Sequence, residues 1–185
     1  MKNAIILHGM PEKKSFYNSD RNSQIFSHWL PWLHQQLMVR DILTQIPSMP
    51  KPFAPVFSDW LDTISQFRIN SDTILVGHSC GAGFWVRFLS ENNIRVSKLI
   101  LVAPWIDPKK EIGDFFDFQI NLEGKVDKIY ILHSQDDFDE IQTSFDILKS
   151  KIPNAETVIF KDKGHFTHGD MGTNEFPELL QIVLK

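Results

Sequence analysis

Short, continuous apolar stretches recur along the chain and are separated by longer segments with a different spacing of apolar residues. The stretches are rich in branched side chains and lack polar alternation, which is typical of strands buried on both faces of a parallel sheet. Six stretches are predicted to be strands: Ala4–Leu7, Ile42–Ile46, Thr73–Val76, Leu99–Val102, Ile129–Leu132 and Val158–Phe160.

Between these strands, apolar residues recur at helical spacing, the pattern of a helix with one buried face. The predicted helices are His28–Arg40, Phe57–Phe67, Ala82–Asn92, Phe138–Ile152 and Pro177–Leu184. Alternating strands and helices predict right-handed βαβ units. We therefore expect one α/β domain over residues 1–185. Its doubly wound, mainly parallel sheet of about six strands should have the local order 2-1-3-4-5-6, with helices on both faces and no large lid.

Two segments are less regular. Residues 11–27 are polar and are predicted to form a long loop, and such loops in compact domains are usually functional or mobile. Residues 104–125 link two strands and are too short for a large lid. The aromatic residues of this segment are Trp105, Phe115, Phe116 and Phe118. They either form a small cap over a pocket or close the core, and both alternatives stay open.

A glycine-bounded serine, Gly77-His78-Ser79-Cys80-Gly81, stands between a predicted strand and a predicted helix. This is the G-x-S-x-G pattern of a nucleophile elbow in its expected context. The turn is tight, so Gly77 and Gly81 are needed where a Cβ would prevent close packing. The strained turn presents the Ser79 hydroxyl above the sheet.

A serine nucleophile needs a base and a carboxylate that orients the base, and in this architecture they follow in the order Ser, Asp or Glu, His. His165 follows the last predicted strand, behind a glycine, and is the preferred base, with His168 as its rival. His78 is too close to bend onto Ser79 and is interpreted as filling space beside the turn. His28 and His34 are interpreted as ordinary surface or packing residues of a helix.

The orienting acid is expected after the strand Ile129–Leu132, where Asp136 and Asp137 stand side by side. Spacing alone does not separate these neighbours. Asp139 is expected at the start of the next helix, where a negative charge complements the helix dipole.

An oxyanion hole requires two backbone N–H groups. The N–H of Cys80 is one candidate, with the thiol as small apolar filling. The N–H of Met10 is the other, because His8-Gly9 ends the first predicted strand and the loop after that strand supplies the second donor in such folds.

Composition excludes several classes of function. The net charge is −4 and there is no basic cluster, so nucleic-acid binding has little electrostatic support. No apolar run approaches the length of a membrane span, and the first strand begins so near Met1 that no signal peptide is expected. With one cysteine there is no disulfide signal, and a cytoplasmic location is the default expectation. The common zinc spacings lack support, so neither a metal nor an organic cofactor is expected.

With these residues placed, the chain resembles the small single-domain α/β-hydrolases, specifically the group of retinoblastoma-binding protein 9 and YdeN-like serine hydrolases. The likeness extends over nearly the whole chain. Besides the elbow, the motifs that carry it are His28-Trp29-Leu30-Pro31-Trp32-Leu33, Met49-Pro50-Lys51-Pro52, Asp59-Trp60-Leu61-Asp62, Ser134-Gln135-Asp136-Asp137 and Gly164-His165-Phe166. The resemblance implies an α/β-hydrolase-type sheet without a large lid. It also selects Asp137 as the acid and His165 as the base. Phe138-Asp139-Glu140 departs from the Pro- or Val-containing stretch that often follows the aspartate pair in the family.

The resulting hypothesis is a serine hydrolase that cleaves small carboxylic esters, with short acyl chains, through the triad Ser79, Asp137 and His165. The same triad also serves thioesterases, amidases and acyltransferases. An alternative from another class is a non-catalytic protein-interaction module on a hydrolase scaffold, because a fold does not determine function. A protein partner and the oligomeric state are not readable from the sequence.

Overall fold

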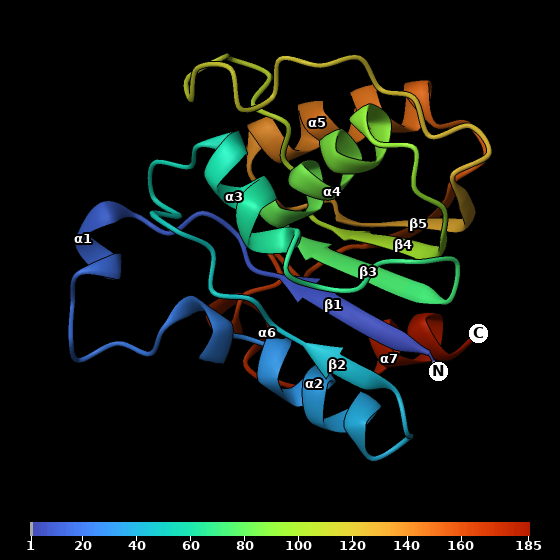
Figure 1. Cartoon of the computed structure of the whole chain (residues 1–185). Coiled ribbons are helices and arrows are strands. Elements are labelled where there is room, and N and C mark those ends of the chain that lie inside the picture. The colour runs from blue at the N-terminus through green and yellow to red at the C-terminus, as the bar shows by residue number, and fades with distance from the viewer. Residues whose placement is uncertain (1) are drawn as a thin grey trace.

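The computed structural model describes residues 2–185, and the strands in this range form one parallel sheet with helices on both faces (Figure 1). The strand order is β2-β1-β3-β4-β5-β6, and every neighbouring pair is parallel. This confirms the predicted order. The six strands are β1 (Asn3–Leu7), β2 (Leu43–Gln45), β3 (Thr73–His78), β4 (Val96–Val102), β5 (Val126–Ser134) and β6 (Glu156–Phe160).

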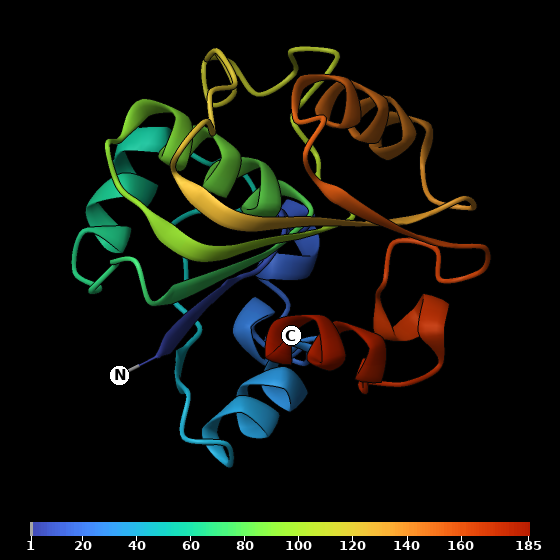
Figure 2. The same cartoon turned by 90° about the vertical axis from the view of Figure 1, so that its right-hand side faces the viewer.

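The longer helices lie in two layers. One face of the sheet is covered by α3 (Phe57–Ile64), α4 (Cys80–Glu91) and α5 (Asp139–Lys151), and the other by α2 (Leu30–Met38) and α7 (Pro177–Leu184) (Figures 1 and 2). Proline occupies the first turn of α2 and of α7, as the sequence indicated. None of the helices between residues 2 and 185 is long and apolar enough to cross a membrane.

Three short helices were not predicted. The predicted loop over residues 11–27 contains α1 (Lys13–Phe16) and the 3-10 helix η1 (Gln24–Phe26), and α6 (His168–Met171) follows β6. The prediction was wrong at these places because helices of three or four residues make about one turn, which is too short to show a helical period.

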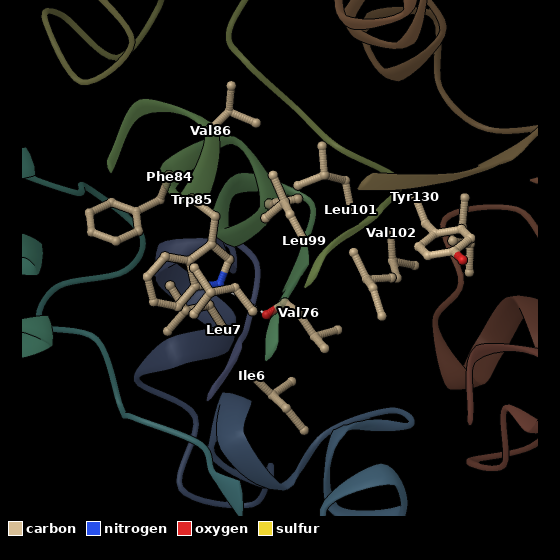
Figure 3. Close-up of a cluster of buried hydrophobic side chains, with 14 of the residues drawn as sticks. Ile6, Leu7, Val76, Phe84, Trp85, Val86, Leu99, Leu101, Val102 and Tyr130 are labelled. Atoms are coloured by element: carbon tan, nitrogen blue, oxygen red, sulfur yellow. Dashed lines mark hydrogen bonds between the residues drawn. The ribbon is translucent and has the colours of Figure 1, made fainter. Parts of the chain in front are cut away.

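The core lies on both faces of the central strands. Every residue of β1 and of β3 is buried, as the continuous apolar stretches predicted. Figure 3 shows Trp85 of α4 beside Val76 of β3, and the indole Nε1–H donates to the Val76 carbonyl at 3.0 Å. That bond satisfies the polar atom of a fully buried tryptophan and joins the helix to the strand that it follows.

Residues 104–125 contain neither helix nor strand, and their aromatic residues have different tasks. Phe115 is fully buried and its ring centroid lies 5.2 Å from that of Trp60, so this residue closes the core. Trp105, at the start of the segment, lines a cavity beside Ser79. Phe115 therefore fits the alternative in which these aromatic residues close the core, and Trp105 fits the one in which they border a pocket.

Candidate active site

Ser79 occupies the sharp turn between β3 and α4 with φ 54° and ψ −121°. A non-glycine residue in this region carries a strain on the order of 1–3 kcal/mol, and such outliers cluster at functional sites. Neighbouring backbone holds the turn in place. The Ser79 N–H donates to the Val102 carbonyl at 2.9 Å, and the Ser79 carbonyl accepts from the N–H groups of Ala82 at 3.0 Å and Trp105 at 3.2 Å.

The glycines around this turn stand where a side chain has no room. A Cβ on Gly77 would lie 2.5 Å from the Cα of Ala82, and one on Gly81 would collide with the carbonyl oxygen of His8. A Cβ on Gly9 would lie 3.0 Å from the Cβ of Ser79. Strand, turn, helix and the loop after β1 therefore converge around the serine.

His165, in the loop after β6, contacts the carboxylate of Asp137, in the loop after β5. Its Nδ1 lies 3.0 Å from Oδ1 and 3.1 Å from Oδ2 of Asp137. The Asp137 side chain is 0% exposed and the His165 side chain 16% exposed. Because a carboxylate only accepts hydrogen bonds, Nδ1 carries a proton, so in the neutral form of the ring the lone pair is on Nε2. The ring is thereby prepared to accept a proton at Nε2.

The neighbouring aspartate has a different role. Oδ1 of Asp136 accepts from the Ser134 hydroxyl at 2.5 Å and from the Gly164 N–H at 2.9 Å. The Ser134 hydroxyl bond lowers the pKa of Asp136. Asp136 therefore holds the backbone before His165, whereas Asp137 contacts the ring. Asp139 begins α5 and lies in its first turn, as expected.

Asp170 holds the loop that carries His165. Its Oδ2 accepts from the His165 N–H at 3.0 Å, the Thr167 N–H at 3.2 Å and the Thr167 hydroxyl at 2.7 Å. Thr167 and Asp170 also form a capping box at the start of α6. Sequence reasoning missed Asp170, although the Thr-x-x-Asp spacing was a visible capping signal.

His78 supports the same loop from the elbow. Its Nε2 donates to the His165 carbonyl at 2.8 Å, and burial lowers the pKa of His78 well below its usual range, so the ring is neutral. The interpretation of His78 as a space-filling residue was therefore incomplete. A buried imidazole of the elbow connects the serine turn to the backbone of the histidine loop.

The two predicted oxyanion donors have unused N–H groups. Within residues 2–185, neither the N–H of Met10 nor that of Cys80 has a hydrogen-bond acceptor. His8 accepts the Met49 N–H at Nε2 at 3.1 Å and donates from Nδ1 to the Gly9 carbonyl at 2.8 Å. In a trans peptide the carbonyl and the N–H point in opposite directions, so fixing the Gly9 carbonyl also fixes the Met10 N–H.

The Cys80 thiol is not a nucleophile in this arrangement. Burial raises the pKa of the thiol, and the side chain is fully buried. A protonated, inaccessible sulfur is chemically inert, because the thiolate is the reactive form. The role of Cys80 is therefore confined to packing and to its backbone N–H.

Two open cavities, of about 560 and 570 Å³, meet at Met10, Glu12, Ser79 and His165. Ser79 and His165 thus line the same space from different loops. Within residues 2–185, the Ser79 hydroxyl makes no hydrogen bond to the His165 ring. Catalytic hydrogen bonds of this kind are often long without substrate and tighten when it binds.

Two further histidines line the first cavity. His168 begins α6, and its backbone N–H donates to Nδ1 of His28 at 3.0 Å. Within residues 2–185, the imidazole that hydrogen-bonds to the Asp137 carboxylate is that of His165, not that of the rival His168. His28 immediately precedes Trp29, the N-cap residue of α2, and has φ 56°. The interpretation of His28 as an ordinary helix residue was wrong, because its placement depends on a contact with residue 168.

Most of the chain matches the model of a known protein family. The family model described as serine hydrolase matches residues 16–184. The chain belongs to the serine hydrolase family. YdeN of Bacillus subtilis (strain 168) is a relative of this serine hydrolase, 28% identical over 168 residues that cover 85% of this chain and 87% of YdeN.

Solved structures agree with the sequence comparison. The crystal structure of the ydeN gene product from B. subtilis has a TM-score of 0.82 at 26% identity, covering 100% of this chain and 97% of that one. XC6422 from Xanthomonas campestris, an α/β serine hydrolase without lid, has a TM-score of 0.58 at 16% identity. The match covers 98% of this chain and 78% of XC6422. The protein is a YdeN-like serine hydrolase with the α/β-hydrolase fold and no large lid, as the resemblance implied.

Proposed function

We propose that this serine hydrolase cleaves carboxylic esters through an acyl-enzyme, with Ser79 as nucleophile, His165 as base and Asp137 as orienting acid. The observation that carries the proposal is the pairing of His165 Nδ1 with the buried Asp137 carboxylate. It leaves Nε2 as a proton acceptor in the cavity that Ser79 also lines.

In this mechanism the Ser79 oxygen attacks the ester carbonyl carbon while His165 Nε2 takes the hydroxyl proton. The carbonyl oxygen becomes an oxyanion and accepts hydrogen bonds from the N–H groups of Met10 and Cys80. When the tetrahedral intermediate collapses, the imidazolium gives its proton to the departing alcohol. Water then attacks the acyl-enzyme by the same route and releases the acid. Each oxyanion donor is expected to contribute about 3 kcal/mol of transition-state stabilisation.

The structure supports this proposal through the shape of the site. The strained turn at Ser79, the unused N–H groups of Met10 and Cys80, and the His165 imidazole oriented by Asp137 are the parts that acyl transfer needs. No step requires a metal or an organic cofactor. The absence of a large lid supports a preference for small esters with short acyl chains.

A fluorophosphonate probe tests the nucleophile. We expect the purified protein to be labelled and Ser79→Ala to abolish labelling, because the probe reacts only with an activated serine. Ser15→Ala is a matched control, since Ser15 lines the same cavity outside the triad, and it should retain labelling. A folded protein that is never labelled would contradict the proposal and favour the interaction module.

A substrate panel tests the bond that is cleaved. p-Nitrophenyl esters of graded chain length are compared with matched thioesters and amides. We expect the highest kcat/KM with a short-chain ester. A thioester or an amide that reacts faster than its matched ester would move the assignment to the corresponding activity on the same triad.

A further inference from the structure

The two cavities that meet at Ser79 differ in chemistry. The first, which we call the polar arm, extends away from the serine along Arg21, Asn22, Gln24, His28, His168 and Asn174. The second, the apolar arm, is lined by the hydrophobic surfaces of Trp105, Ile112, Phe138 and Ile141. A substrate held at Ser79 therefore has two different environments on the two sides of its reacting carbonyl.

The polar arm contains a positive charge without a balancing acid. Within residues 2–185, the Arg21 guanidinium contacts only the Ser15 hydroxyl, at 3.4 Å, and pairs with no carboxylate. The acid that lines this cavity, Glu12, lies at the junction, because it also lines the apolar arm. Arg21 is thus the charged side chain that lines the outer part of the polar arm, and within residues 2–185 neither Glu12 at the junction nor Asp170, whose charge acts on His28, is paired with it.

His28 adds an oriented donor to the polar arm. Its Nδ1 accepts the His168 N–H, so the neutral ring carries its proton on Nε2. Burial is the main cause that lowers the pKa of His28, and the charge of the nearby His165 lowers it further. The His28 ring is therefore neutral at neutral pH. Within the described residues, Nε2–H has no acceptor.

The apolar arm does not offer a comparable cation. Lys109 is paired with Glu140 at 2.7 Å, and the other oxygen of Glu140 accepts the Trp105 Nε1–H at 3.0 Å. Glu111 and Asp139 add negative charge to this cavity. The ring of Phe138 is 69% exposed and its centroid lies 5.5 Å from that of His165, so it presents an apolar surface beside the base.

We propose that the substrate is an ester with two unlike portions: an apolar or aromatic portion bound in the apolar arm, and a carboxylate bound in the polar arm. Arg21 and the Nε2–H of His28 are the donors for the carboxylate. The inference rests on the proposed esterase function, and it names the class of ester. Acidic side chains in the apolar arm repel the carboxylate and orient the substrate.

Matched esters that differ only in one charged group test this proposal. The first pair is the monophenyl ester of adipic acid against phenyl hexanoate, with the carboxylate on the acyl side. The second pair is the phenylacetyl ester of glycolate against ethyl phenylacetate, with the carboxylate on the alcohol side. In at least one pair, we expect kcat/KM to be about tenfold higher for the anionic ester, the range for a charge-assisted hydrogen bond.

Variants of polar-arm residues test whether the preference for the anionic ester over the neutral ester arises there. Arg21→Gln and His28→Asn should each reduce this ratio of kcat/KM values severalfold, mainly by raising the KM of the anionic ester. Asparagine is chosen because it tolerates a left-handed φ. Arg95→Gln is the matched control, because Arg95 pairs with Asp127 on the surface away from both cavities, and it should keep the full preference.

The outcomes separate the two proposals. Hydrolysis of the neutral esters without any preference for the anionic ones overturns this inference and leaves the esterase function standing. A preference that survives both Arg21→Gln and His28→Asn also overturns it. A folded protein that hydrolyses none of the four esters overturns this inference, and the proposed function is contradicted as well only if the same protein also cleaves none of the p-nitrophenyl esters in the panel above.

Discussion

Asp136 and Asp137 are neighbours in the sequence, and their side chains contact different groups. Asp137 contacts the His165 ring, whereas Asp136 accepts from Ser134 and Gly164. From the residues alone the choice between them stayed open, because both follow the same strand. The resemblance to the family selected Asp137, and it is the Asp137 carboxylate that contacts the His165 ring.

Replacing Asp137 is expected to be far more damaging than replacing Asp136. In Asp137→Asn the amide NH₂ donates to Nδ1 and favours the tautomer with a protonated Nε2, which cannot accept the Ser79 proton. We expect kcat to fall by about 10³- to 10⁴-fold in an ester hydrolysis assay. In Asp136→Asn the amide oxygen still accepts from Ser134 and Gly164, so kcat should fall less than about tenfold. Equal losses in the two variants would contradict the assignment.

Among the loops, the one between β6 and α6 determines where the proposed base, His165, lies. Its backbone is held by Asp170 and by His78, and Phe166, with φ 55°, is fully buried beyond the histidine. No periodic pattern in the sequence indicates these contacts. Sequence reasoning therefore singled out His165 but not Asp170 and His78, which hold its loop.

The variant Asp170→Ala tests whether these supports matter for activity. The variant removes the carboxylate oxygen that accepts hydrogen bonds from the N–H of His165 and from the N–H and hydroxyl of Thr167. We expect kcat to fall at least tenfold while KM changes little, because the base is displaced and the cavity remains. Asp170→Asn keeps an acceptor oxygen and should recover part of kcat. A purely structural role would lower the melting temperature of Asp170→Ala without changing kcat of the folded fraction.

A buried lysine joins β4 to the last turn of α7. Lys98 is 7% exposed, and its Nζ donates to the carbonyls of Ile182 at 3.0 Å and Val183 at 2.8 Å. These are carbonyls that a helix end leaves without intrahelical partners. Burial lowers the pKa of Lys98 to about 8.

The lowered pKa predicts a pH dependence of stability. A lysine in the unfolded chain has a pKa near 10.4, so between about pH 8 and 10.4 the unfolded state binds more protons than the folded state. The free energy of unfolding should therefore rise through this window, by at most about 1.4 kcal/mol per pH unit, relative to Lys98→Met. Urea unfolding of both proteins from pH 7 to 10.5 measures the difference. Parallel pH curves would contradict the prediction.

At the scale of the whole molecule, the core is continuous across the sheet. Buried residues from β1, β3, β4 and β5 and from the helices on both faces belong to one cluster, and Val158 and Phe160 of β6 pack against it while partly buried. The single domain over residues 1–185 stays a prediction, and it has a thermodynamic consequence. Calorimetry should show one unfolding transition with a calorimetric enthalpy close to the van't Hoff enthalpy. Two resolved transitions would contradict the single domain.

The sequence by itself determined the order of the strands and of the longer helices, the glycine-bounded turn at Ser79, and the edge of the sheet where the proposed partners of Ser79 lie. Periodicity and tight-turn sterics are properties of a few consecutive residues, and parallel strands bring their carboxyl ends to one edge. Only the tertiary structure decided that Asp170 holds the histidine loop, that His28 faces a cavity, and that two unlike cavities meet at Ser79. These features depend on contacts between residues as distant as 28 and 168, whose geometry is set by the packing of whole loops and has no local signature in the chain.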